Sequence, residues 1–363
     1  MSSESARSTH VLVVDDSAVV RQTMLALLSA EPDLTVDVAA DPLIAMEKMS
    51  LRNPDVIVLD LEMPRMDGMT FLKKIMREGP RPVIVCSGLV GTGSDGALRA
   101  LEEGAVDVIA KPRIGLKTFL NDSAVMLIDA IRAAALVQMP RGRFFDRRPW
   151  SADAVVPRLA RRPDVRERFR IIAIGASTGG PDAICRILTE LPPNAPGVVV
   201  VQHMPEGFTA SFARRLDDLS AIEVKEAEQG DEVRPGRALI ARGDHHLVIY
   251  EYASRLYVDV KRGPLVRRHR PSVDVLFRSV AQTAGSDAAG ILLTGMGDDG
   301  AEGLGEMKDA GAWTIAESEE SCAVFGMPRA AIARGAATDV LPVTSIAPAL
   351  LRQFLVSSSP GRQ

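Results

Sequence analysis

The sequence is poor in cysteine, in net charge and in long apolar runs, and each shortage excludes a class of protein. Its three cysteines, Cys86, Cys185 and Cys322, lie far apart and form no Cys-x-x-Cys pair, which predicts buried reduced thiols rather than disulfides. The formal net charge of −4 gives no global basic field for nucleic acid. No segment approaches the roughly 18 apolar residues that a membrane span needs, and the start, MSSESARSTH, lacks an apolar signal core. We therefore expect a cytoplasmic protein that neither binds nucleic acid nor inserts directly into a membrane.

Apolar runs of strand length alternate with amphipathic stretches in two series, and 363 residues exceed the roughly 100–200 of one domain. The first series lies in residues 1–137 and the second in residues 170–357, with a predicted hairpin over residues 245–260. Such alternation is typical of a parallel sheet with helices on both faces. Residues 138–169 interrupt it with arginine and proline, which favours a solvated linker over a docking site for an acidic partner. The predicted fold class is α/β, with two doubly wound parallel-sheet domains joined by that linker.

Charged and polar side chains follow four of the apolar runs in the first series. Because the carboxyl ends of neighbouring parallel strands converge on one crevice, we expect these side chains to meet. Three carboxylates suit Mg²⁺, while a hydroxyl and an ammonium suit the oxygens of a phosphoryl group. A turn or a helix cap explains any single aspartate after a strand, but it does not explain the agreement of four strand ends. The residues are Asp15 and Asp16, Asp60, Ser87 and Lys111.

The segment IIAIGASTGGP, residues 171–181, offers a choice between a phosphate cradle and a mount for a reactive serine. Ser177 stands where a dinucleotide fingerprint needs its middle glycine, and Pro181 stands where a P-loop needs lysine. The pattern Gly-x-Ser-x-Gly instead predicts a hydroxyl exposed at a strand-to-turn junction. An ordinary strand-to-helix turn explains the same letters, so a nucleophile needs partners elsewhere in the chain.

A nucleophilic serine needs a base and an orienting carboxylate, and two later strand ends supply candidates. His203 directly follows the run GVVVVQ, which places it at the same sheet edge as Ser177. The segment GMGDDG offers Asp298 and Asp299, between which chain position does not decide, and backbone amides for an oxyanion. Zinc is the rival use of these residues, but neither H-E-x-x-H nor Cys-pair spacing is present. Three later histidines fit surface or hairpin positions better: His245, His246 and His269.

The residues at the four strand ends, with the segments LDLEMPRMDG and KP, resemble the receiver domain of bacterial response regulators. The resemblance implies a flavodoxin-like fold in which Asp60 accepts a phosphoryl group from a chemotaxis histidine kinase. Val108 departs from the family pattern, since receivers usually carry an aromatic residue three positions before the lysine, and this weakens any aromatic relay here. The implied Mg²⁺ ligands are Asp15, Asp16 and Asp60, and the implied phosphate sensors are Ser87 and Lys111.

The second series resembles the catalytic domain of the chemotaxis receptor methylesterases of the CheB type. The resemblance implies that Ser177 is the nucleophile, His203 the base and Asp299 the orienting acid. It also implies that the Met296 amide holds the oxyanion and that Thr178 supports the nucleophile. The segments that carry the resemblance are GASTGGP, VVVVQHMPEGFTASFARRLD, GRALIARGDHHL, RPSVDVLFRS, LLTGMGDDGAEG and EESCAVFGMPRAAI.

The resemblance implies an enzyme that hydrolyses glutamate O-methyl esters on chemoreceptors, releases methanol and deamidates receptor glutamines, without a cofactor at the esterase site. It further implies that the receiver blocks this site until Asp60 is phosphorylated. A receiver-regulated esterase with a target outside chemotaxis would carry the same residues, and only substrate tests separate the two. A non-enzymatic binding module is a third hypothesis, under which Ser177→Ala would change nothing.

Overall fold

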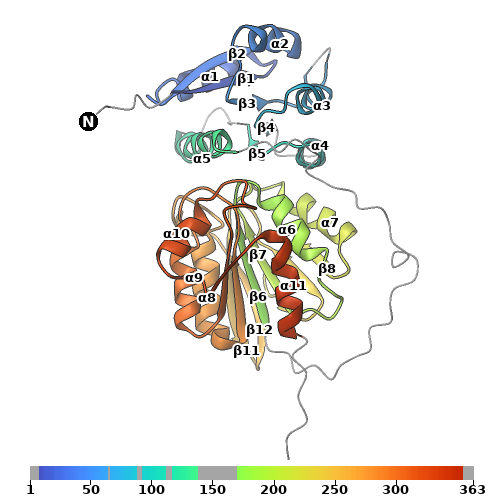
Figure 1. Ribbon diagram of the computed structural model, residues 1–363, viewed down its shortest axis with the longest axis vertical. Helices are drawn as coiled ribbons and strands as arrows, with labels where there is room; N and C mark the ends of the chain where they lie inside the picture. The colour runs from blue at the N-terminus through green and yellow to red at the C-terminus, as the bar shows by residue number, and fades with distance from the viewer. Residues whose placement is uncertain (1–7, 64–65, 88–91, 112–116, 138–169, 355–363) are drawn as a thin grey trace, which may run out of the picture.

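The computed structural model describes residues 8–63, 66–87, 92–111, 117–137 and 170–354, in which two large parallel sheets are covered by helices (Figure 1). The predicted α/β class with two parallel-sheet units is confirmed. The predicted linker, residues 138–169, lies outside the described residues. Among the helices that the structure describes, none combines the length and the hydropathy that crossing a membrane requires.

The first sheet is built from short strands that are almost wholly apolar. Its strands are β1 (Thr9–Val14), β2 (Leu34–Ala39), β3 (Val56–Leu59), β4 (Val83–Ser87) and β5 (Asp107–Ala110). They are all parallel and lie in the order β2-β1-β3-β4-β5. The alternating helices are α1 (Ala18–Leu28), α2 (Pro42–Leu51), α3 (Gly68–Glu78), α4 (Thr92–Glu102) and α5 (Lys117–Ala135). Strands β3 and β4 are buried along their whole length, since helices cover both faces.

The second sheet has seven parallel strands in the order β15-β14-β13-β6-β7-β10-β8. Their bounds are β6 (Ile171–Ala176), β7 (Gly197–Gln202), β8 (Glu223–Glu226), β10 (Arg237–Ile240), β13 (Ala288–Leu292), β14 (Trp313–Glu317) and β15 (Asp339–Leu341). The helices are α6 (Gly180–Leu188), α7 (Thr209–Leu219), α8 (Val273–Ala284), α9 (Ala301–Asp309), α10 (Met327–Ala333) and α11 (Val343–Phe354). The predicted hairpin is confirmed as β11 (His246–Tyr252) and β12 (Arg255–Lys261), which join β9 (Glu232–Val233) in a small antiparallel sheet.

Strands β6, β7 and β13 lie side by side in the centre of the second sheet. Gly175 pairs with Leu292 of β13 and Ala176 pairs with Gln202 of β7, so the three strands end at nearly the same level. The loops that follow them therefore open onto one edge of the sheet.

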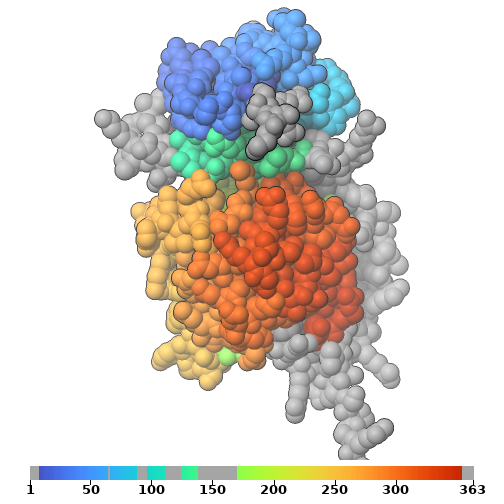
Figure 2. Space-filling model, turned by 60° about the vertical axis from the view of Figure 1, so that its left-hand side comes forward, coloured from blue at the N-terminus to red at the C-terminus, as the bar shows by residue number. Residues whose placement is uncertain are grey.

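The first domain covers this edge of the second sheet. In Figure 1 the elements α4, β5 and α5 lie between the rest of the first sheet and the second domain, and Figure 2 shows them in green against the orange surface. Between the described residues of the two domains, ion pairs join Arg215 Nε to Glu102 Oε1 at 2.5 Å and Arg268 to Asp129 Oδ2 at 3.3 Å. Met296 of the second domain packs against the apolar core of the first.

Candidate active site

Carboxylates meet at the carboxyl edge of the first sheet. Ligand oxygens of Asp15, Asp16 and Asp60 lie within 4.8 Å of one another. The Lys111 ammonium lies 2.7 Å from Oδ2 of Asp60 and 3.0 Å from Oδ2 of Asp15. Ser87 is buried at the end of the neighbouring strand β4. Three carboxylates form a set of hard oxygen donors, which fits Mg²⁺.

The Asp60 carboxyl group is buried. Burial raises the pKa of this carboxyl, while the hydrogen bond and charge of Lys111 oppose the rise. Oδ1 of Asp60 also accepts a hydrogen bond from the Glu62 amide at 3.2 Å. A divalent cation among the three carboxylates would offset the same desolvation cost, so the electrostatics of the cluster favour cation binding.

In the second domain, Ser177 stands at the junction of β6 and α6. Its amide donates to the Thr294 carbonyl at 3.0 Å, and its own carbonyl accepts from the Gly180 amide at 2.7 Å. Gly179 has a φ of 78°, and a Cβ there would come within 2.4 Å of the Ala323 Cβ. The turn therefore requires glycine at this position, and it leaves the serine half-buried rather than enclosed in the core.

His203 and Asp299 form a tight pair across the same edge. Nε2 of His203 lies 2.8 Å from Oδ2 of Asp299, which also accepts from the Val273 amide at 2.7 Å. Oδ1 of Asp299 accepts from the Ser272 hydroxyl at 2.8 Å and the Asp274 amide at 3.1 Å. Burial alone would raise the pKa of the Asp299 carboxyl, but the His203 hydrogen bond and charge and the two amides outweigh it and hold that pKa below its usual value. The carboxylate is thus ionised at neutral pH, and both of its oxygens accept hydrogen bonds.

The other ring nitrogen of His203 is available for chemistry. Nδ1 is buried and has no hydrogen-bond partner among the described residues. It belongs to a residue that lines, with Ser177, Met296 and Asp299, a cavity of about 90 Å³. Because a buried polar atom without a partner is costly, an unpaired nitrogen in this cavity indicates a functional site.

Packing separates the two aspartates that chain position leaves equivalent. Asp298 is half-buried and pairs with Arg334 at 3.2 Å and with Arg267 at 3.5 Å. Asp299 is 1% exposed and holds His203. Asp298 therefore has its own partners and does not contact the imidazole through any hydrogen bond in the described part of the chain.

Thr178, next to the serine, bonds a residue of the first domain. Its hydroxyl donates to Oδ2 of Asp107 at 3.0 Å, and its carbonyl accepts from the Thr294 hydroxyl at 2.9 Å. Burial raises the pKa of the Asp107 carboxyl to about 6, although the Val108 amide and the Thr178 hydroxyl oppose the rise. Asp107 and Val108 both line the cavity that contains Ser177. The Thr178 hydroxyl, beside the serine, is thus hydrogen-bonded to a carboxyl group of the first domain.

The sequence does not predict that His269 contacts the imidazole of His203. His269 does lie in a hairpin turn, but its ring stacks on that of His203, with centroids 3.7 Å apart and planes 7° from parallel. The only signal in the sequence is that His269 directly precedes the segment RPSVD, whose amides hold Asp299. That contact becomes evident only once the fold is known.

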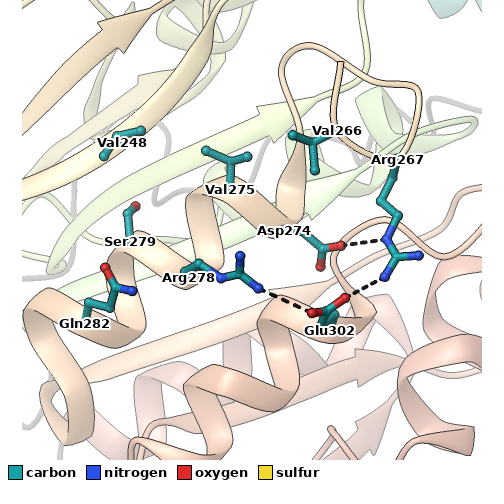
Figure 3. Close-up of a pocket in the computed structure, with 9 residues that line it drawn as sticks. All are labelled: Val248, Val266, Arg267, Asp274, Val275, Arg278, Ser279, Gln282 and Glu302. Carbon is teal, nitrogen blue, oxygen red and sulfur yellow. Dashed lines mark hydrogen bonds and ion pairs between the residues drawn. The ribbon is translucent and has the colours of Figure 1, made fainter. Parts of the chain in front are cut away.

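A second cavity, of about 330 Å³, lies beside α8 on the flank of this domain (Figure 3). Its two arginines, Arg267 and Arg278, are both paired with Glu302, at 2.5 and 3.3 Å, and Arg267 also contacts Asp274 at 3.4 Å. Because carboxylates satisfy these cations, the cavity does not present an anion site. Its ion pairs instead fix the turn that carries Arg267.

Comparison with known families divides the chain in the same way. Residues 172–350 match the model of the CheB methylesterase family, and residues 11–119 match that of the response regulator receiver domain. The chain is 54% identical over 352 residues to protein-glutamate methylesterase/protein-glutamine glutaminase 5 of Anaeromyxobacter dehalogenans, covering 96% of this chain and 97% of the relative.

Two further comparisons agree. A protein-glutamate methylesterase/protein-glutamine glutaminase of Geobacter metallireducens is 52% identical over 95% of this chain and 99% of its own length. The crystal structure of the Thermotoga maritima CheB methylesterase catalytic domain superposes with a TM-score of 0.50 and 42% identity, covering 51% of this chain and 98% of that one.

Proposed function

This chain belongs to the CheB methylesterase family, as a hydrolase that carries a receiver domain, and on that premise we propose that it demethylates chemoreceptors. The proposed substrates are glutamate O-methyl esters, which yield methanol, and glutamine amides, which yield ammonia. One observation carries the proposal: the unpartnered Nδ1 of His203 shares a cavity with Ser177, while its Nε2 is held by Asp299.

In the proposed mechanism the Ser177 hydroxyl attacks the acyl carbon while Nδ1 of His203 takes its proton. The tetrahedral oxyanion accepts a hydrogen bond from the Met296 amide, and removal of one such donor typically costs about 3 kcal/mol of transition-state stabilisation. His203 then protonates the departing methoxide. Water, deprotonated by the same nitrogen, hydrolyses the acyl-enzyme to glutamate and restores the serine.

Asp299 has an orienting role in this scheme. Its ionised carboxylate keeps the imidazole proton on Nε2, so that Nδ1 carries the lone pair that accepts the serine proton. The roles of the two ring nitrogens follow from the hydrogen bond to Asp299, which involves Nε2. The amides of Val273 and Asp274 keep the carboxylate from taking the proton itself.

We further propose that phosphorylation of Asp60 by a chemotaxis histidine kinase controls access to this cavity. Asp15, Asp16 and Asp60 would hold Mg²⁺, which when bound supplies positive charge to balance the phosphoryl group. Ser87 and Lys111 would contact the phosphate oxygens. Support comes from their common position at one strand edge and from the first domain's contacts over the cavity.

Phosphorylation must therefore favour the arrangement in which the domains separate. A tenfold activation needs only about 1.4 kcal/mol of differential stabilisation, comparable to a few interface contacts. Val108 lies buried in the cavity wall, where an aromatic relay residue is usual in receivers. The proposed route for coupling is consequently a shift of β5 and α5 as a unit.

Methanol release from methyl-labelled chemoreceptor tests both proposals. Wild type and Ser177→Ala are compared, each with and without a small phosphodonor and Mg²⁺. Release that requires Ser177 and rises with the phosphodonor is expected. Release by Ser177→Ala at the wild-type rate would exclude the serine mechanism, and release that ignores the phosphodonor would exclude the switch. Serine-dependent hydrolysis of a small ester without receptor demethylation would indicate another target.

A further inference from the structure

Asp299 fixes only one atom of the His203 ring. The single hydrogen bond at Nε2 does not by itself prevent rotation of the ring plane. Any such rotation swings Nδ1 away from the cavity that it shares with Ser177. Acid–base catalysis depends on the placement of the proton acceptor to within an ångström, so a second contact is needed to fix the plane.

The stacked ring of His269 supplies this contact. Its centroid lies 3.7 Å from that of His203 and the planes are 7° from parallel, so the two rings are in van der Waals contact across a whole face. A flat neighbour at this distance allows the His203 ring to slide but not to tilt. It also excludes water from that face.

The backbone that presents His269 is strained. Val266 and His269 exchange backbone hydrogen bonds of 2.9 and 3.1 Å, which closes a two-residue hairpin over Arg267 and Arg268. Both arginines adopt left-handed backbone angles, with φ of 50° and 68°. Glycine or asparagine takes these angles at lower cost, and strain of this kind concentrates at functional sites.

Ion pairs on both sides of His269 hold the strained turn in place. The Arg267 guanidinium lies between Asp274 and Glu302, at 3.4 and 2.5 Å (Figure 3). On the other side, Nε of Arg270 donates to Oδ1 of Asp244 at 2.9 Å. The turn is thus anchored to α8, to α9 and to the loop before β11, and His269 has little freedom to leave the stack.

The charge state of His269 suits a neighbour of a catalytic base. Burial lowers the pKa of its imidazole well below the usual value, and the positive charges of His203 and Arg268 lower it further while Asp299 opposes them. The ring is therefore neutral near neutral pH and does not repel the imidazolium that forms during turnover. The charged groups that line the same cavity are Asp107, Asp129, Arg267, Arg268, Asp298 and Asp299.

We propose that His269 is a positioning residue, whose stacked ring holds the His203 imidazole in the plane that presents Nδ1 to Ser177. The inference rests on the proposed function, in which His203 is the base. His269 itself contacts neither the nucleophile nor the acyl group in this scheme.

The test compares two substitutions in the full-length protein, activated by a phosphodonor and Mg²⁺, by methanol release from methyl-labelled receptor. His269→Phe keeps a flat ring and should retain kcat within about threefold. His269→Ala removes the ring and should lower kcat by roughly ten- to a hundredfold with little change in KM. His245→Ala is the matched control, since that imidazole contacts the Gly243 carbonyl and does not line the cavity.

The pH profile separates positioning from simple scaffolding. Removal of the ring admits water to the face of His203 and favours its charged form, so the acid limb of kcat/KM should move to higher pH in His269→Ala and stay in place in His269→Phe. Equal loss of kcat in both variants, or loss in His269→Ala that only follows a lower unfolding midpoint with an unmoved limb, overturns the proposal. Failure of the proposed function is distinguishable, because wild type itself would then show no Ser177-dependent release.

Discussion

At the scale of single residues, we expect substitution of the two neighbouring aspartates, Asp298 and Asp299, to have opposite effects on turnover. Asp299→Asn places an amide NH₂ against donors and removes the charge that fixes the His203 tautomer, so kcat for methanol release should fall by roughly 10³–10⁴. Leaving buried donors without an acceptor should also destabilise the fold by about 1–3 kcal/mol, measurable in urea.

Asp298→Asn is the matched control for this prediction. Its carboxylate pairs with Arg267 and Arg334 at the surface, so the substitution should change kcat by less than about threefold and stability by under about 1 kcal/mol. A large loss of turnover in Asp298→Asn with a mild effect in Asp299→Asn would mean that the wrong carboxylate has been assigned.

At the scale of elements, the turn between β6 and α6 predicts a strict need for glycine. Gly179→Ala forces a left-handed φ on a residue with a Cβ and drives that Cβ into Ala323 and Thr294. We expect a loss of about 2–4 kcal/mol of unfolding free energy and strongly reduced turnover, because Ser177 lies on this turn.

Gly230→Ala isolates the backbone contribution to that loss. Gly230 has a similar φ of 82°, but nothing lies within 4 Å of its Cβ position. It should cost only about 1 kcal/mol and leave methanol release unchanged. Equal destabilisation by the two substitutions would show that the clash at Gly179 relaxes and does not constrain the serine.

Strand-level features are also where sequence reasoning succeeds. The runs IIAIGA and GVVVVQ predict buried parallel strands, and the structure places them side by side as β6 and β7, with β13 next to β6. Since residues after parallel strands share an edge, Ser177 and His203 are brought to one cavity. A local apolar run is a sufficient signal here because each strand is buried on both faces.

Sequence reasoning fails for contacts between segments that are distant in the chain. The ring nitrogen that meets Asp299, the stacking of His269 and the bond from Thr178 to Asp107 all join residues that are far apart in the chain. None leaves a local pattern, since each depends on how loops pack after the sheets have formed. Chain position alone likewise leaves Asp298 and Asp299 equivalent. The family resemblance implies Asp299, and the hydrogen bonds from the amides of residues 273 and 274 to its carboxylate appear only in the folded structure.

At the scale of the whole molecule, the bond between Asp107 and Thr178 makes the domain interface sensitive to pH. In the arrangement that the structure shows, with the first domain over the cavity (the closed arrangement), burial raises the pKa of Asp107 to about 6. A solvated aspartate titrates near 4. A group whose pKa is raised in the closed arrangement stabilises it fully below the lower value, and this stabilisation is lost as the pH rises through the upper one. Inhibition by the unphosphorylated first domain should therefore be stronger at pH 5 than at pH 7.5.

Comparison with Asp107→Asn isolates this effect from the titration of the active site. The amide stays neutral and still accepts from the Thr178 hydroxyl. The ratio of variant to wild-type methanol release, measured without phosphodonor, should therefore fall as the pH rises from 5 to 7.5, the range in which Asp107 changes charge. We expect the variant to be the less active protein at pH 7.5, because wild-type Asp107 is then ionised and weakens closure, and the difference between the two proteins to be smaller at pH 5. Asp129→Asn, which removes the ion pair with Arg268, is the matched control and should raise basal release by a similar factor at both pH values.

A ratio for Asp107→Asn that stays constant between pH 5 and 7.5 would show that the carboxyl remains in one protonation state, and closure would then depend on the ion pairs and apolar contacts alone.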